Sequence, residues 1–107
     1  MKATLLPILI VLIQSTTSVS AQSIGFTFHN GSLKSIPLVI PSVMNPNLNP
    51  LSNSGIELKI GQNVYFYPNG TSKKRELLFK VDDTFQQNQV LEIDQLIEKR
   101  KKELKNK

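Results

Sequence analysis

The stretch Ile56-Glu57-Leu58-Lys59-Ile60-Gly61-Gln62-Asn63-Val64-Tyr65-Phe66-Tyr67-Pro68-Asn69-Gly70 decides the predicted fold. Apolar and polar residues alternate, the pattern breaks at Gly61-Gln62, and the alternation then resumes. Such alternation is typical of a β-strand with one face buried. The Pro-Asn-Gly ending is typical of a tight hairpin turn, because its residues adopt the backbone angles that such turns require. The stretch therefore predicts two strands followed by a turn into a third.

Four further runs favour strands on either side of this stretch. They cover residues 24–28, 33–40, 75–81 and 90–91, and the third run would place Leu77, Phe79 and Val81 on one face. Pro37 interrupts the second run, which predicts an edge strand or a bulge there because proline lacks an amide hydrogen. Short strands separated by frequent turns predict a mainly β fold, either a small antiparallel β-sandwich or a partly open barrel.

The C-terminal residues change to a helical period. Asp94 has the side chain of a good N-cap, and Ile93, Leu96 and Ile97 recur on one helical face. Beyond Ile97 the apolar stripe nearly stops. We expect a C-terminal α-helix over about 94–105, with its first turn packed on the β domain and its later turns projecting into solvent.

Positive charge is concentrated in this tail. The last ten residues carry six basic and two acidic side chains, whereas residues 22–97 carry six of each. The candidate anion-binding residues are Lys99, Arg100, Lys101, Lys102 and Lys105. They would attract an acidic macromolecule or an anionic surface, with an affinity that falls as salt is added. The tail has no aromatic residue for base stacking, so we expect no specific nucleic-acid recognition. The alternative is a solvated helix end that only aids solubility.

The first 21 residues have the layout of an export signal. Lys2 supplies a positive start, residues 3–13 are apolar, and Val19-Ser20-Ala21 fits the small-residue pattern of a cleavage site. The apolar run is shorter than the roughly 20 residues that a membrane-spanning helix needs. We expect a signal peptide at 1–21, cleavage near Ala21, and one small β domain at 22–107. That domain would be exported to the periplasm or secreted, with no transmembrane segment.

The segment Pro41–Gly55 is predicted to be an ordered loop. It is rich in proline, asparagine and serine, and its four remaining apolar residues should anchor it to the domain: Val43, Met44, Leu48 and Leu51. Loops of this length in compact domains are often functional. The candidate binding residues are Met44, Asn45, Asn47, Asn49 and Asn53. The alternative is a structural crossover that closes one end of the sandwich.

Residues with catalytic or metal-binding chemistry are scarce. The chain has one histidine, His29, no cysteine, and no Gly-x-Ser-x-Gly sequence. Without cysteine it has no disulfides. We therefore expect no enzyme activity and no cofactor, with His29 and Met44 as weak candidates for metal binding. Two hypotheses follow. The first is an exported, non-catalytic binding or accessory module that uses the loop, the basic helix or both. The second is a periplasmic carrier of a small ligand or metal, with its site near His29 and Met44.

Several stretches carry a resemblance that covers most of the chain after residue 28. They are residues 30–38 (NGSLKSIPL), 41–50 (PSVMNPNLNP), 54–62 (SGIELKIGQ) and 96–104 (LIEKRKKEL). Together they resemble small exported bacterial proteins that have a signal peptide and no assigned function. The resemblance implies export and a single unit that includes both loop and tail, and it implies no activity.

Overall fold

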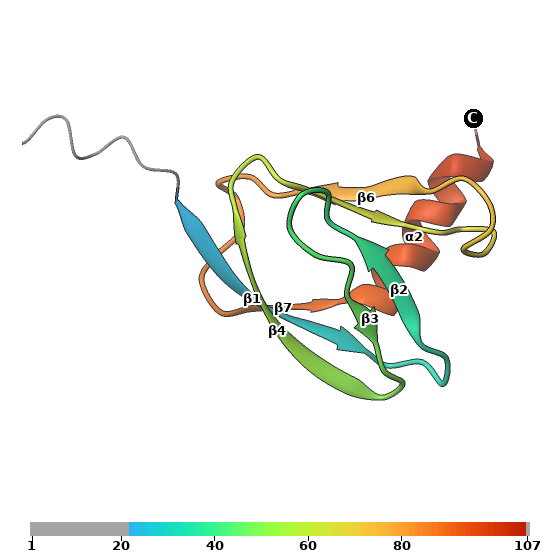
Figure 1. Ribbon diagram of the computed structural model, residues 1–107, viewed down its shortest axis with the longest axis horizontal. Coiled ribbons are helices and arrows are strands. Elements are labelled where there is room, and N and C mark those ends of the chain that lie inside the picture. The colour runs from blue at the N-terminus through green and yellow to red at the C-terminus, as the bar shows by residue number, and fades with distance from the viewer. Residues whose placement is uncertain (1–21, 107) are drawn as a thin grey trace, which may run out of the picture.

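The computed structural model describes residues 22–106, which form a mainly β fold with a C-terminal helix (Figure 1). The elements in chain order are β1 (Ser23–Asn30), β2 (Ile36–Val39), β3 (Asn47–Leu48), β4 (Ser52–Lys59), β5 (Asn63–Phe66), β6 (Glu76–Lys80), β7 (Gln89–Glu92) and α2 (Ile93–Lys105). The strands form two sheets with the orders β4-β1-β7 and β3-β2-β5-β6. The two sheets do not close into a barrel. The predicted mainly β fold with a C-terminal helix is confirmed.

The first sheet is not wholly antiparallel. β1 pairs with β4 in antiparallel fashion along eight residues, whereas it pairs with β7 in parallel. The loop before β7 fixes this direction, because Asn88 donates its backbone N–H to the Gly25 carbonyl and Gln87 binds the backbone of Ser23 and Gly25. The chain therefore enters the sheet near the start of β1 and runs alongside it.

The core lies between the two sheets and is built by strand alternation. Every second residue of β1 is buried, including Ile24, Phe26 and Phe28, as the sequence pattern predicts. The other fully buried apolar side chains come from both sheets and the start of the helix: Leu38, Ile40, Leu48, Leu58, Val64, Phe66, Val81 and Ile93. Both sheets thus contribute to one shared core.

β6 departs from the predicted alternation. Val64 pairs with Phe79 and Tyr65 pairs with Leu77, so Leu78 is the extra residue of a β-bulge. A bulge locally breaks the two-residue period and turns the extra side chain. As a result Leu78 is buried, and Leu77, opposite Tyr65, does not have the predicted inward face. Phe79, opposite the buried Val64, is partly buried and packs against the core as predicted. Phe79 still packs against Phe28, with ring centroids 6.1 Å apart.

β2 is a central strand of its sheet and not the predicted edge strand, but Pro37 itself pairs only with β3 and lies at a local edge on its β5 side. The strand pairs with β3 on one side and β5 on the other. The Leu38 N–H donates to the Pro46 carbonyl on the β3 side, so the Pro37 nitrogen faces the β5 side. The pairing with β5 ends at Phe66, opposite Leu38. Pro37 is tolerated because its missing donor falls one residue beyond that ladder.

α2 begins directly from β7, and the predicted N-cap is therefore wrong by two residues. Glu92 is both the last residue of β7 and the N-cap, and its side chain makes no capping hydrogen bond within the described chain. Asp94 lies in the first turn of the helix instead. There its Oδ1 accepts a hydrogen bond from the Gly31 N–H at 3.1 Å, which ties the helix to the end of β1.

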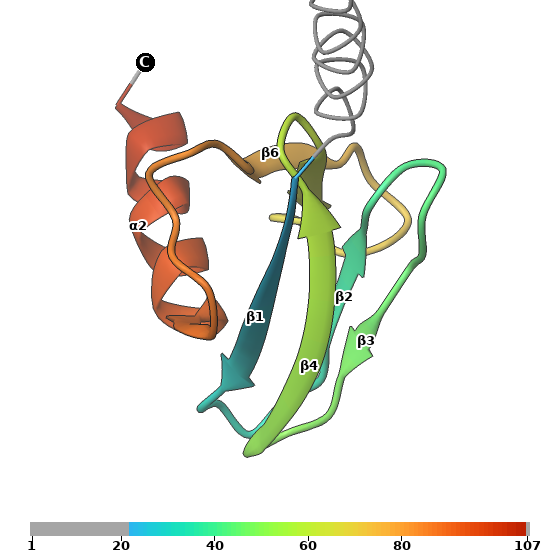
Figure 2. The ribbon, with the colours of Figure 1, turned by 90° about the vertical axis from the view of Figure 1, so that its left-hand side faces the viewer.

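α2 packs on the β domain along most of its length, so the predicted projecting tail is also wrong. It contacts β1, β6 and β7 and lies beside these strands (Figures 1 and 2). Leu96, Ile97 and Leu104 are partly buried against the core. Arg100 adds a hydrogen bond from its Nε to the Leu77 carbonyl at 2.8 Å. A thin apolar stripe is sufficient because the arginine also contacts the domain.

Candidate functional site

The predicted Pro41–Gly55 loop is not one loop. It contains β3 and the first half of β4, separated by a short turn. Ser52 to Gly55 pair with β1 through the backbone, and alternate side chains there are exposed. Asparagine, serine and glycine are depleted in strands, so the sequence gives no strand signal there. The partner strand imposes the extended conformation.

The candidate residues of this segment lie at two ends of the sheets. Met44 and Asn45 are in the β2–β3 connection, where Met44 forms a bridge with Ile40. Asn49 follows β3, and Asn53 is on the first half of β4. Figure 2 shows the β2–β3 and β3–β4 connections at opposite ends of the strands. Asn47 lies between them on β3 and is exposed. The structure therefore does not bring these candidates together into one binding surface.

Only one of the four predicted apolar anchors is buried. Leu48 is 1% exposed, whereas Val43, Met44 and Leu51 are 42%, 45% and 64% exposed. Leu51 also has a positive φ of 52°, which is uncommon for a leucine. Its N–H donates to the Ser32 carbonyl at 3.2 Å, and this contact holds the turn in place.

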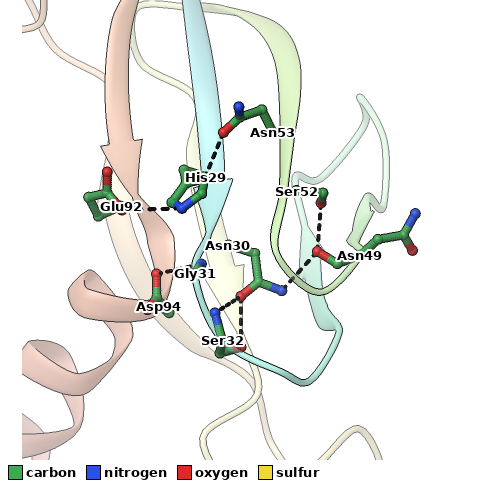
Figure 3. Close-up of polar contacts among 9 residues, drawn as sticks. All are labelled: His29, Asn30, Gly31, Ser32, Asn49, Ser52, Asn53, Glu92 and Asp94. Carbon is green, nitrogen blue, oxygen red and sulfur yellow. Dashed lines mark hydrogen bonds and ion pairs between the residues drawn. The ribbon is translucent and has the colours of Figure 1, made fainter.

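Asn30 anchors this end of the molecule. Its side chain is fully buried at the end of β1 (Figure 3). The amide nitrogen donates to the carbonyls of Lys34, Leu48 and Asn49, at 2.7, 3.2 and 3.1 Å. The amide oxygen accepts from the backbone N–H and the hydroxyl of Ser32. Asn30 therefore joins the β1–β2 connection to the β3–β4 turn.

His29 lies beside Asn30 but faces the other side of β1 (Figure 3). Its Nδ1 lies 2.7 Å from Oδ1 of Asn53, and its Nε2 lies 3.8 Å from Oε1 of Glu92. Met44 belongs to the opposite end of the strands and is not a neighbour. Among residues 22–106, no three histidine, cysteine or acidic side chains form a group that could hold a metal ion. The structure therefore does not assemble the predicted site at His29 and Met44.

The basic residues of α2 divide into two kinds. Arg100 is partly buried, bound to the Leu77 carbonyl and paired with Glu103 at 3.0 Å. The other four candidates have exposed side chains: Lys99, Lys101, Lys102 and Lys105. Arg100 thus serves mainly to attach the helix, and the four lysines remain available to a partner.

A second basic stretch lies in the turn that borders the helix. Lys73, Lys74 and Arg75 are exposed in the β5–β6 turn. This turn borders the helix, because Pro68, Asn69, Lys101, Leu104, Lys105 and Glu76 line a groove of about 530 Å³. A neighbouring groove of about 480 Å³ is shared by Thr71 of the turn and Lys101, among other residues. The two segments that meet here carry five exposed cations: Lys73, Lys74 and Arg75 on the turn, and Lys101 and Lys105 on the helix.

We call these five residues the basic end. The Arg75 guanidinium lies 4.6 Å from the centroid of the Tyr65 ring, a cation–π distance that limits its motion without removing its charge. Glu76 lines the groove and offsets part of the positive charge. No signal in the sequence could have joined the two stretches, because about 25 residues and two strands, β6 and β7, separate them.

Searches against protein-family models, curated proteins and solved structures found no match to the chain. The resemblance to small exported bacterial proteins stays a prediction. Within residues 22–106, no helix has the length and apolar content needed to cross a membrane. The predicted signal peptide at 1–21 lies outside the described residues.

Proposed function

We propose that this protein is an exported, non-catalytic binding module that attaches to an acidic macromolecule or an anionic surface through its basic end. The observation that carries the proposal is the meeting of two basic segments: the β5–β6 turn, which bears Lys73, Lys74 and Arg75, borders α2 where the helix bears Lys101 and Lys105. Clustered cations raise the local concentration of a polyanion and bind it through charge rather than sequence. Leu104 adds an apolar side chain to the groove that Lys101 and Lys105 also line.

The basic residues of α2 belong to a fixed surface and not to a projecting tail. Because α2 is held by Leu96, Ile97, Leu104 and Arg100, its lysines keep a constant position relative to the β5–β6 turn. A fixed array loses less side-chain and backbone entropy on binding than a frayed tail. Binding is therefore expected to depend on the fold as well as on the number of lysines.

The direct test is binding of the protein to vesicles of phosphatidylglycerol and phosphatidylcholine, and to heparin as a soluble polyanion, over a series of salt concentrations. Each basic residue near an anionic surface contributes about 1 kcal/mol. Lys101→Gln with Lys105→Gln should therefore weaken binding by about 30-fold. Added salt should weaken binding of the unaltered protein, since counterions are released on association.

The matched control is Lys59→Gln with Lys80→Gln, which removes the same charge from exposed positions of the β domain. This variant should bind almost as well as the unaltered protein. Equal losses in the two variants would show that only net charge matters and would overturn the basic end as the site. Absence of binding at low salt would overturn the proposal as a whole.

Export is part of the same proposal and has its own test. The support is the pattern of Lys2, the apolar run 3–13 and Val19-Ser20-Ala21. The mass of the protein recovered outside the cytoplasm should correspond to residues 22–107. Recovery of the uncleaved chain inside the cytoplasm would contradict export and leave the anion-binding proposal to its own experiment.

A further inference from the structure

The outer edge of β4 is the longest strand edge in the described chain that no other element covers. The sheet edges are β4 and β7 in one sheet and β3 and β6 in the other. β3 has only two residues, and β7 has four and continues directly into α2. β6 is contacted by α2, with Arg100 bound to the Leu77 carbonyl. β4 has eight residues, and its register with β1 has no bulge.

Four residues of β4 direct their backbone groups away from β1, and Lys59 is one of them. The Ile60 N–H donates to Gln22, just beyond the end of the β1–β4 ladder, whereas the Lys59 N–H donates to Oε1 of Gln62. In an antiparallel pair the direction alternates along the strand. The N–H and C=O groups of Asn53, Gly55 and Glu57 therefore point outward with that of Lys59. Within residues 22–106 they have no hydrogen-bond partner.

Apart from one charge, Glu57, before its last residue, this edge lacks the devices that usually prevent strand pairing. Proteins protect long edges with proline, bulges, inward charges or central lysines. β4 contains no proline, and its only lysine, Lys59, is its last residue. Asn53, Gly55 and Glu57 are all exposed, and a Cβ added at Gly55 would meet no atom within 4 Å. The middle of the edge is therefore open to another strand.

We propose that β4 pairs with β4 of a second copy of this chain, in antiparallel orientation, about a two-fold axis at Gly55. This register places Gly55 opposite Gly55 and Asn53 opposite Glu57 of the second copy. Outward-facing residues then exchange both backbone hydrogen bonds, as an antiparallel ladder requires. The pairing joins the two β4-β1-β7 sheets into one continuous sheet.

The side chains fit this register. Oδ1 of Asn53 is taken by Nδ1 of His29 at 2.7 Å, which leaves the Asn53 amide N–H groups to donate elsewhere. Glu57 is exposed and its carboxylate can accept them. Because the axis is two-fold, the Asn53–Glu57 contact occurs twice. Gly55 has no side chain to separate the backbones at the axis.

The first experiment measures self-association and amide exchange on the protein as its host cell processes it. Sedimentation over a concentration series should show a reversible dimer. Hydrogen exchange of Asn53, Gly55 and Glu57 should be slow in the dimer and become fast on dilution. The amides of Ile56 and Leu58 face β1 and should stay protected at every concentration. A monomer at all concentrations, or fast exchange of the three amides in the dimer, would overturn the proposal.

Two charge variants identify the interface. Glu57→Lys removes both carboxylates that face Asn53 and should weaken dimerisation by about tenfold or more. Asp83→Lys makes the same charge change at an exposed loop position and should dimerise normally. Both should keep the melting temperature of the unaltered monomer. If the two variants dimerise equally well, the interface is not at β4. Protection of the three amides only after a different protein is added would assign the edge to that protein and also contradict the proposal.

Discussion

At the residue scale, one buried amide organises an end of the molecule. The Asn30 side chain forms hydrogen bonds with the β1–β2 connection and with the β3–β4 turn. Buried amides are stable only when their donors and acceptors are paired, and this one is paired on both sides. The result is a fixed turn that presents Leu33 and Leu51 to solvent.

Asn30→Ala should lower the free energy of unfolding by about 2–3 kcal/mol, because buried carbonyls lose their donor. Urea denaturation measures this change. Asn47→Ala is the matched control, since Asn47 is exposed on β3, and it should cost less than about 0.5 kcal/mol. Similar costs at the two positions would show that the Asn30 network contributes nothing to stability.

A second prediction at this scale concerns Asp82. The hydroxyl of Thr84, and then its backbone N–H, donate to the Asp82 carboxylate and hold the pKa of that carboxyl below its ordinary value. Since the folded state lowers this pKa, its stabilising effect is present above the ordinary carboxyl pKa and is lost as the pH falls through the lower, folded value.

The measurement is an NMR titration of the Asp82 carboxyl carbon. Thr84→Ala should raise the pKa of Asp82 toward its ordinary value, because the hydroxyl donor is removed. Thr84→Ser keeps a hydroxyl and should leave the pKa low. A low pKa in the alanine variant would assign the effect to another group.

At the element scale, α2 and the bulged β6 depend on each other. Arg100 and the apolar residues Leu96, Ile97 and Leu104 attach the helix to the sheet. The bulge at Leu78 sends that side chain into the core and places Leu77 on a different face from Phe79, which packs against the core. The helix is therefore an integral part of the domain and not an appendage.

Arg100→Ala should lower the free energy of unfolding by about 1 kcal/mol, because it removes the hydrogen bond to the Leu77 carbonyl and the packing of the side-chain stem. Lys102→Ala is the control, since Lys102 is exposed on the same helix and should cost less than about 0.5 kcal/mol. Thermal melts of the two variants test the difference. A neutral Arg100→Ala would show that Leu96, Ile97 and Leu104 attach the helix without the arginine.

At the scale of the whole molecule, the two sheets share one core, and the fold gathers charge from distant segments. Leu58 of one sheet and Phe66 of the other are each 1% exposed and belong to the same cluster. The β5–β6 turn and α2 meet on the outside of this core and together form the basic end. Function is therefore proposed for a surface that exists only in the folded chain.

Leu58→Ala and Phe66→Ala should each lower the free energy of unfolding by about 2–5 kcal/mol, because each leaves a cavity in the shared core. Lys59→Ala, next to Leu58 on the exposed face of β4, should cost less than about 0.5 kcal/mol. Chemical denaturation should show one transition for every variant. Separate transitions for Leu58→Ala and Phe66→Ala would show that the sheets unfold independently.

The sequence by itself determined the fold class, the inward faces of β1, the second half of β4 and β5, and the presence of a C-terminal helix. These follow from hydrophobic period, which depends on residues a few positions apart. Only the tertiary structure decided the rest. The strand at Ser52–Gly55 is held by β1, the inward turn of Leu78 by the bulge against β5, and the helix start by β7. His29 and Met44 were separated, and the β5–β6 turn was brought beside α2, because contacts between distant segments depend on how the sheets pack and carry no local pattern.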